Sequence, residues 1–331
     1  MAELAPIKRG FEKIMKKKYY HLFGPVPSRR FGRSLGVDLT PYKTCTLDCI
    51  FCQLGRTTNK TIDREEYVLV ADVLGELKDW LRMNGNADYI TLSGSGEPTL
   101  HSRFGEVLEF IHANSEIPAV LLSNGTMFHL PEVRAAAACA DIVKVSLSAW
   151  DQASYGLVNR PHPQMLFDHF IEGQKAFRAQ FSGQLWMEVF LVRGINSTPS
   201  DVRKIAALAK EIGPDRIQLN TAVRPPSEDF AAALSRECME ALTHLFHPTA
   251  EVIAEFNTIH AKSIQANQDT ILSMLRRRPC TAEDVADVFH MHLNEVSKYL
   301  GKLIRTNQIR SDRKNGAVYY SAVSKNGEDN A

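Results

Sequence analysis

Long apolar runs are absent from the 331-residue sequence, in which no segment approaches the roughly 20 consecutive apolar residues that a membrane helix requires. The N-terminal stretch MAELAPIKRGFEKIMKKKYYHLFG mixes charged side chains throughout and lacks the apolar centre of a secretory signal peptide. A surplus of either charge is also absent, because the formal net charge is +1 at pH 7. With 44% hydrophobic residues, the chain can form a large core and one small additional domain. We therefore expect a globular, cytoplasmic protein without a membrane partner.

Cysteine is scarce, and its six residues are unevenly distributed. Cys45, Cys49 and Cys52 lie within the stretch KTCTLDCIFCQLGRTTNK, and the other three are scattered: Cys139, Cys238 and Cys280. In a reducing compartment such crowding favours metal ligation over disulfide bonds. The fourth Cys or His of a closed tetrahedral site is missing nearby, and an open position is what a catalytic metal keeps for its substrate. The alternatives are a structural zinc ion completed by His21 or a more distant His, and unliganded core cysteines.

Short apolar runs alternate with amphipathic stretches over most of the chain. The runs, which we expect to be buried strands, are SLGVDLT (34–40), YITLS (89–93), AVLLS (119–123), DIVKVSLS (141–148), WMEVFLV (186–192) and RIQLNT (216–221). Helical patterns such as VADVLGELKDWLRMNG and SDVRKIAALAKEIG lie between them. This alternation predicts an α/β fold with a parallel sheet, open or curved into a partial barrel. Ligands of such folds bind beyond the carboxyl ends of the strands, where the cysteine stretch follows the first strand.

The C-terminal part has a different character. After the Pro-rich segment VRPPSED (223–229), a helical connector leads to residues 270–323, which read as three helices and two short strands around Asn315-Gly316. That order resembles a winged helix. Residues 270–323 carry nine Lys or Arg against five Asp or Glu, a local excess of +4.

The stretch CTLDCIFC resembles the CxxxCxxC loop of the radical S-adenosylmethionine (SAM) superfamily, in which an aromatic residue, here Phe51, precedes the last Cys. The resemblance implies a partial (β/α)6 barrel of TIM type and a 4Fe-4S cluster. In this family the three thiolates, here Cys45, Cys49 and Cys52, hold three irons, and the fourth iron takes the amino and carboxylate groups of SAM. The missing fourth cysteine is thereby explained.

A second motif supports this resemblance. LSGSGEPTL (92–100) is similar to the GGE-type motif of the family, with Gly96 and Glu97 matching and Ser95 in place of the first Gly of the pair. Its glycines permit close backbone approach, and its carboxylate suits the SAM ammonium group. The resemblance implies these SAM contacts: Phe51, Gly94, Gly96, Glu97, Asn124, Ser146 and Ser148. The alternatives are a solvated loop charge for Glu97 and plain turn chemistry for Asn124-Gly125.

Substrate contacts are less defined by the sequence. FLVRGIN (190–196) lies where the family keeps its adenine-binding strand, and the candidate substrate residues near the last strand ends are Arg193, Asn196, Gln218, Asn220 and Arg224. Arg29, Arg30 and Arg33 precede the first strand and would meet a phosphate or carboxylate, or form a solvated basic edge.

Within the superfamily, residues 19 to about 228 resemble uncharacterised proteins grouped with the wyosine-forming tRNA enzymes. Those enzymes carry a second cysteine cluster on the N-terminal side, whereas this chain has no Cys before Cys45, so we expect one cluster and no wyosine formation. The expected organisation is an N-terminal extension (1–18), a radical SAM core (19–228), a helical connector (229–268), a winged-helix-like domain (269–323) and a disordered tail (324–331).

The resemblance implies that a one-electron donor such as flavodoxin or ferredoxin reduces the cluster, and that SAM is then cleaved to methionine and a 5′-deoxyadenosyl radical acting on an unidentified substrate. The candidate recognition helix, LNEVSKYLGKLI (293–304), offers only Lys298 and Lys302 as cations, which favours docking of the substrate or its carrier over reading of DNA bases. The catalytic residues would then all lie within 19–228. Two alternatives remain: an RNA-modifying enzyme that docks RNA through residues 269–323, and an iron–sulfur redox-sensing transcription regulator.

Overall fold

The computed structural model describes residues 19–28, 32–223, 225–253, 268–289, 291, 293–314 and 317–323. Within these ranges no helix is long and apolar enough to cross a membrane. Several of the expected features lie outside the described residues: the extension 1–18, Arg29, Arg30, Arg224, part of the connector, Asn315-Gly316 and the tail 324–331.

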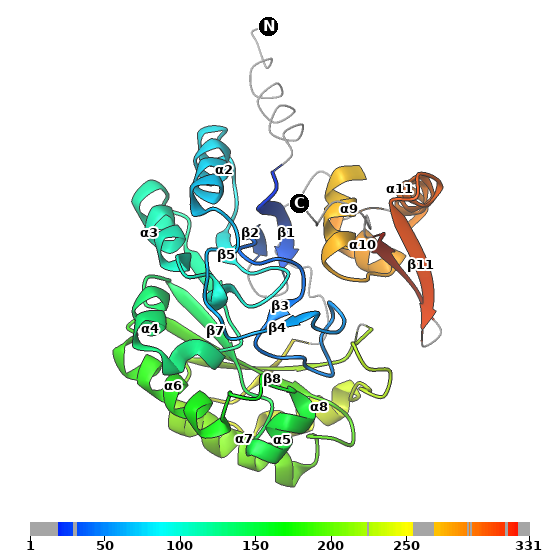
Figure 1. The fold of residues 1–331 in the computed structure, drawn as a ribbon. Helices are drawn as coiled ribbons and strands as arrows, with labels where there is room; N and C mark the ends of the chain where they lie inside the picture. Colours follow the sequence, from blue (N-terminus) through cyan, green and yellow to red (C-terminus); the bar gives the residue numbers. More distant parts are fainter. Residues whose placement is uncertain are drawn as a thin grey trace, which may run out of the picture.

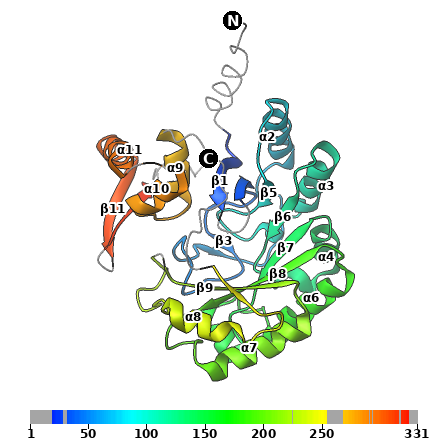
Figure 2. The same ribbon diagram turned by 180° about the vertical axis from the view of Figure 1, so that it is seen from behind.

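A sheet of eight strands, in the order β1-β2-β5-β6-β7-β8-β9-β10, forms the centre of the molecule (Figures 1 and 2). Its strands are Leu22–Ser28 (β1), Gly32–Val37 (β2), Tyr89–Leu92 (β5), Ala119–Leu122 (β6), Ile142–Ser146 (β7), Gln184–Leu191 (β8), Arg216–Thr221 (β9) and Glu251–Val252 (β10). β1 is antiparallel to β2, and the other neighbouring pairs are parallel. The six strands from β2 to β9 are those that the apolar runs predict, whereas β1 and β10 at the two edges are additional.

Helices follow the parallel strands along the chain. They are Val70–Arg82 (α2), Phe104–Asn114 (α3), Pro131–Ala137 (α4), Gln152–Val158 (α5), Phe167–Gln180 (α6), Pro199–Ile212 (α7) and Arg236–Thr243 (α8), with single turns at Pro98–Leu100 (η1) and Thr126–His129 (η2). Figures 1 and 2 show α2, α3, α4, α6 and α7 in an arc along the outer side of the sheet. α7 has local start and stop signals, because the Thr198 hydroxyl accepts a hydrogen bond from the Asp201 amide and Gly213 ends the helix in the left-handed region.

The two faces of the sheet differ in composition, as β8 illustrates. Leu185, Met187, Val189 and Leu191 belong to the main core beneath the helices. The alternate residues lie on the inner face: Trp186 packs in a small cluster with Val120 and Ile142, while Glu188 and Phe190 line a cavity. The helix-covered face of the sheet is therefore apolar, whereas the inner face carries both polar groups and the small apolar cluster around Trp186.

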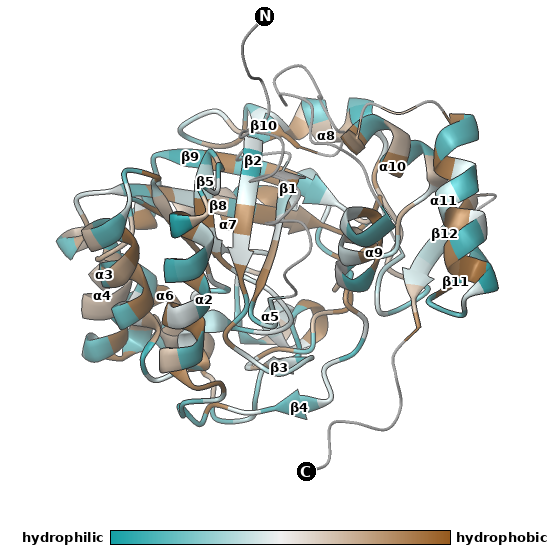
Figure 3. Cartoon of the chain, turned by 90° about the horizontal axis from the view of Figure 1, so that it is seen from above, coloured by the Kyte–Doolittle hydropathy of each residue, from teal (hydrophilic) through white to brown (hydrophobic). Residues whose placement is uncertain are grey.

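The C-terminal unit has a separate core. It comprises α9 (Gln268–Arg277), α10 (Ala282–Phe289), α11 (Leu293–Arg305) and the antiparallel pair β11 (Ile309–Lys314) and β12 (Ala317–Ala322). Residues of all three helices, with Cys280 and Ile309, form its buried cluster. α9 packs beside β1, and in Figure 3 the unit lies on the side of the sheet away from α3, α4 and α6. This is the order of elements that the sequence predicts for this segment.

Candidate active site

The cysteine loop (residues 43–60) lies beyond the carboxyl end of β2, at the edge of the sheet where the parallel strands end. Two short strands, Thr44–Cys45 (β3) and Asn59–Lys60 (β4), pair in parallel and close the loop on itself. The Glu97 amide, in the turn after β5, donates to the Thr44 carbonyl at 3.0 Å. The loop is therefore fixed at both ends and against the neighbouring strand connection.

Each thiol of this loop receives one N–H donor from a different part of the chain. Lys43 Nζ lies 3.3 Å from Cys52 Sγ. Asn124 Nδ2, after β6, lies 3.5 Å from Cys45 Sγ, and Asn159 Nδ2, at the end of α5, lies 3.3 Å from Cys49 Sγ. The three predicted thiols are thus gathered at one place, each beside a group that stabilises negative charge on sulfur.

The free thiols of Cys45 and Cys49 are held in their neutral form. Burial, with a further contribution from the charge of Glu97, raises the pKa of Cys45 to about 12. Burial also raises the pKa of Cys49, and the charges of Cys52 and Cys45 add to it. Among the described residues no three His, Cys, Asp or Glu side chains are arranged to hold a metal ion. A group that binds these sulfurs must displace their protons.

The SGSGEP loop (residues 93–98) lies directly against the cysteine loop. A Cβ atom on Gly96 would be 1.9 Å from the Thr44 carbonyl oxygen, so only glycine fits there. The Lys43 amide donates to the Ser95 carbonyl at 2.7 Å. The Ser95 hydroxyl donates to Asp38 Oδ2 at 2.6 Å. Ser95, which replaces the first Gly of the family motif, therefore helps to hold the SGSGEP loop in place.

Glu97 is buried, with 2% of its surface exposed, so it is not a solvated loop charge. Its Oε1 accepts hydrogen bonds from the Thr99 amide, the Thr99 hydroxyl and the Ser123 hydroxyl at 3.1, 2.6 and 2.7 Å. Its Oε2 accepts one from the Asn124 amide at 2.7 Å. Burial raises the pKa of Glu97, and these four hydrogen bonds oppose that shift. Glu97 joins the turns after β5 and β6.

The other predicted SAM contacts fall at strand ends but differ in their surroundings. The Asn124 side chain donates to Thr46 Oγ1 at 2.9 Å as well as approaching Cys45, so it does more than shape a turn. Ser146 is half-buried at the end of β7. The Ser148 hydroxyl is buried and accepts the Phe190 amide at 3.0 Å, which places it in the packing between β7 and β8.

A cavity of about 400 Å³ opens on the inner face of the sheet beside the cysteine loop. Phe51 and Cys52 line it, and the Phe51 ring stacks on Phe190 with centroids 4.0 Å apart. Gly94, by contrast, lies with its Cα against the Asp38 carboxylate. The cavity wall also includes Met274, Arg278 and Val288 of the C-terminal unit. The sequence places all catalytic residues within 19–228, whereas part of this wall comes from beyond that range.

A polar layer beside this cavity was predicted from the sequence only at Asn220. Lys144 and Glu188, on β7 and β8, form a largely buried ion pair, and Asn220 Nδ2 on β9 donates to Glu188 Oε1 at 2.7 Å. Across the sheet, the hydroxyls of Ser34 and Thr91 lie 2.6 Å apart. The signal in the sequence was a charged residue inside each of two apolar runs, Lys144 in IVKVSLS and Glu188 in WMEVFLV.

The remaining substrate candidates have other roles, with the exception of Asn220. Asn196 is buried, and its amide bonds the backbone at Ser148, Phe190 and Val192. Gln218 Nε2 donates to Glu251 at 2.8 Å, and the Arg193 side chain is exposed. Arg33 pairs with Asp88 at the amino ends of β2 and β5, the edge of the sheet opposite the cysteine loop.

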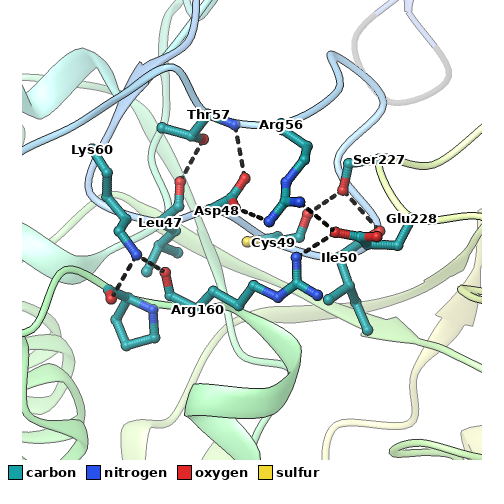
Figure 4. Close-up of polar contacts among 11 residues, drawn as sticks. Leu47, Asp48, Cys49, Ile50, Arg56, Thr57, Lys60, Arg160, Ser227 and Glu228 are labelled. Atoms are coloured by element: carbon teal, nitrogen blue, oxygen red, sulfur yellow. Dashed lines mark hydrogen bonds and ion pairs between the residues drawn. The ribbon is translucent and has the colours of Figure 1, made fainter.

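Residues 227 and 228 fasten the cysteine loop from its far side (Figure 4). The Ser227 hydroxyl donates to the carbonyls of Cys49 and Ile50 at 2.8 and 2.9 Å. The Glu228 amide donates to Ile50 at 3.1 Å, and its carboxylate pairs with Arg160 and, at 3.6 Å, with Arg56. These contacts join the segment after β9 to the loop that carries the thiols.

Comparison with known proteins gives concordant matches. Residues 39–209 match the family model described as Radical SAM superfamily. A protein of Brachyspira hyodysenteriae named GTPase Obg is 34% identical over 92% of this chain, which spans about half (46%) of that relative's length. A UPF0026 protein of Helicobacter pylori is 33% identical, and the match covers 91% of this chain and 97% of that protein. A radical SAM methyltransferase from Sphaerobacter thermophilus has a similar fold (TM-score 0.50, 17% identity, 66% of this chain and 65% of that one).

Proposed function

The chain belongs to the radical SAM superfamily, and we propose that Cys45, Cys49 and Cys52 hold its 4Fe-4S cluster while a small polar substrate binds in the adjoining cavity. The protein is a radical SAM enzyme, and the superfamily uses a 4Fe-4S cluster and SAM. When bound, the cluster would pass one electron from an external donor to SAM, whose cleavage to methionine and a 5′-deoxyadenosyl radical would supply the group that abstracts hydrogen. The observation that carries the proposal is the set of three gathered thiols, each with its own N–H donor.

The residues present fit the cluster. Thiolates are the ligands that iron–sulfur clusters take, and hydrogen bonds to the sulfurs are one of the protein's means of tuning them. Lys43, Asn124 and Asn159 are placed to provide those hydrogen bonds. Because burial keeps the free thiols of Cys45 and Cys49 protonated, loading should release protons.

Residues of the SGSGEP loop and its neighbours would hold SAM. Among the described contacts, Glu97 Oε1 accepts three hydrogen bonds and Oε2 accepts one, so Oε2 has room for the SAM ammonium group. Gly96 brings the backbone of this loop against the cysteine loop. Phe51 lines the cavity on the cluster side and would cover the adenosyl part. Gly94 of the SGSGEP loop, Asn124 after β6, and Ser146 and Ser148 at and after the end of β7 would lie at the strand ends around SAM.

The C-terminal unit would serve the substrate. We assign it as a winged-helix-like unit that docks the substrate or its carrier, because three of its side chains, Met274, Arg278 and Val288, line the cavity. The lining groups Ser34, Thr91, Glu188 and Asn220 favour a substrate with several hydrogen-bonding groups, and hence a polar one. A one-electron donor such as flavodoxin or ferredoxin would act from outside, in a cytoplasmic setting that keeps thiols reduced.

An RNA-borne substrate is the second candidate. It is favoured by the basic excess of residues 270–323 and by the likeness of residues 19–228 to proteins grouped with the wyosine-type tRNA enzymes. RNA that copurifies with the full-length protein and is altered by it would favour this form of the proposal over a free small molecule.

Alanine substitution of single cysteines tests the proposal. After anaerobic reconstitution, Cys45→Ala, Cys49→Ala and Cys52→Ala should each lose the brown chromophore and the formation of 5′-deoxyadenosine under dithionite. Cys139→Ala, Cys238→Ala and Cys280→Ala are matched controls that should keep both, because these residues lie away from the loop. One zinc ion per chain and no iron in the wild-type protein would refute the proposal.

A further inference from the structure

Tyr155 is a buried tyrosine on α5, the helix that ends against the cysteine loop. Only 1% of its surface is exposed, and its ring packs with Phe167 and Phe170 at centroid distances of 5.5 and 5.2 Å. A capping box between Asp151 and Ser154 fixes the start of the helix. The position of the phenol ring is therefore well determined by its surroundings.

The hydroxyl of Tyr155 has no hydrogen-bond partner among the described residues. Two other buried polar atoms share this property, Arg134 Nε and Gln174 Oε1, but their side chains make hydrogen bonds through other atoms. The hydroxyl is the sole polar group of the Tyr155 side chain, so its hydrogen-bonding capacity is wholly unused. Burying such a group is destabilising unless a partner is supplied, which points to a partner beyond the described residues, such as a bound group.

The surroundings of Tyr155 indicate which group that is. Asn159 follows one helical turn later on the same side of α5, and its Nδ2 donates to Cys49 Sγ at 3.3 Å. Two loop amides donate to the end of the helix, Asp48 to the Asn159 carbonyl and Ile50 to the Val158 carbonyl, both at 3.0 Å. Burial raises the pKa of Tyr155, so its hydroxyl stays protonated and can act as a hydrogen-bond donor.

We propose that the Tyr155 hydroxyl donates one hydrogen bond to a sulfur atom on the Cys49 side of the cluster held by Cys45, Cys49 and Cys52, and thereby raises the reduction potential of the cluster. The inference rests on the proposed assignment of these cysteines as cluster ligands. Hydrogen bonds to the sulfurs of an iron–sulfur cluster favour the more reduced, more negative state. Tyr155 would act alongside Asn159, from the same face of the same helix, and it lies within the span that matches the family model but outside its cysteine motif.

This arrangement predicts effects of opposite sign in the two forms of the protein. Without the cluster, Tyr155→Phe removes a buried hydroxyl that lacks a partner and leaves the ring packing in place, so the apoprotein should become more stable. With the cluster bound, the same change removes a hydrogen bond to it. A purely structural tyrosine would change both forms in the same direction.

The test compares Tyr155→Phe with Tyr67→Phe in the full-length protein. The Tyr67 hydroxyl donates to the Asp63 carbonyl at 2.9 Å, so this control should lower the melting temperature of both forms and leave the cluster unchanged. Tyr155→Phe should raise the melting temperature of the apoprotein by about 2 to 4 °C. It should also release iron to a chelator roughly tenfold faster, the scale for losing an outer partner of a metal ligand, and lower the reduction potential measured by redox titration.

An apoprotein destabilised by Tyr155→Phe would show that the hydroxyl has a partner within the chain, which would overturn the inference. Unchanged iron release and potential in the variant would overturn it as well. Failure of the underlying assignment is recognised separately, because wild-type iron content in the three cysteine variants would remove the cluster from Cys45 and Cys49 whatever Tyr155→Phe does.

Discussion

Substitution of Gly96 by alanine should separate assembly of the site from formation of the fold. The added Cβ would lie 1.9 Å from the Thr44 carbonyl oxygen and 2.8 Å from Thr40 Oγ1. The Thr40 hydroxyl can turn away, but the Thr44 carbonyl is backbone and accepts the Glu97 amide. The SGSGEP loop must therefore withdraw from the cysteine loop by about 1.5 Å, from 1.9 Å to the 3.4 Å at which ordinary van der Waals contact begins.

The cost follows from the hydrogen bonds that this movement breaks. Two backbone bonds join the loops, from the Glu97 amide to Thr44 at 3.0 Å and from the Lys43 amide to Ser95 at 2.7 Å. A buried group left without its partner costs about 1 to 3 kcal/mol, so losing both bonds gives about 2 to 6 kcal/mol. Because the clashing atoms are loop backbone and one threonine hydroxyl, and no side chain of the sheet core, the variant should still fold.

Urea unfolding of the apoprotein and the iron content after reconstitution would measure the two effects. Gly96→Ala should lower the free energy of unfolding by the amount above and lose most of its iron. Gly75→Ala is the matched control, since its Cβ would meet no atom within 4 Å and lies inside α2, where alanine stabilises by about 1 kcal/mol. Wild-type stability and full iron content in Gly96→Ala would refute the loop contact.

Two further predictions concern the carboxylates beside the cysteine loop. Burial raises the pKa of the Glu97 carboxyl in the folded state, so the folded protein binds the carboxyl proton more tightly than the unfolded chain does. The stability that this proton contributes is therefore present at low pH and is lost as pH rises through the folded pKa. Urea unfolding of the apoprotein from pH 4 to 7 should show the wild type losing stability relative to Glu97→Gln, and parallel curves for the two proteins would contradict the prediction. Glu228→Gln should speed amide hydrogen exchange in residues 45–57, because the Glu228 carboxylate pairs with Arg160 and Arg56. The control Asp229→Asn changes a side chain that is 91% exposed and should leave exchange unchanged. Equal exchange in the two variants would show that Glu228 does not fasten the cysteine loop.

The central strands were predictable because parallel strands are buried on both faces and therefore appear as near-continuous apolar runs. β1 escaped prediction because Leu22–Ser28 contains Gly24, Pro25 and Pro27, which suggest a loop, although proline is tolerated in an edge strand. β10 has only two residues and so carries no periodicity. The edge strands of the sheet were the least predictable from the sequence, because pairing with the neighbouring strand takes the place of local sequence signals there.

The candidate site likewise contains some residues that the sequence predicts and others that only the fold brings together. Cys45, Cys49 and Cys52 were found because their spacing is local, whereas Asn159 lies 110 positions from Cys49 and only the fold brings its amide to the sulfur. Polar residues at strand ends were ambiguous because backbone N–H and C=O groups where a strand ends need hydrogen-bond partners, and polar side chains can provide them. Asn196 does so with all of its bonds, and sequence alone does not distinguish that use from binding a ligand.

The C-terminal unit meets the core at two places of unequal strength. Near β11, Lys314 pairs with Asp229 at 3.1 Å, but Asp229 is almost fully exposed, and such pairs contribute about 1 kcal/mol or less. At α9, buried Met274 contributes both to the unit's own core and to the wall of the cavity, beside β1. Apolar burial at α9 therefore contributes more than the exposed ion pair to holding the unit in place, and the same side chain borders the cavity. A displacement of α9 would change the shape of the cavity wall.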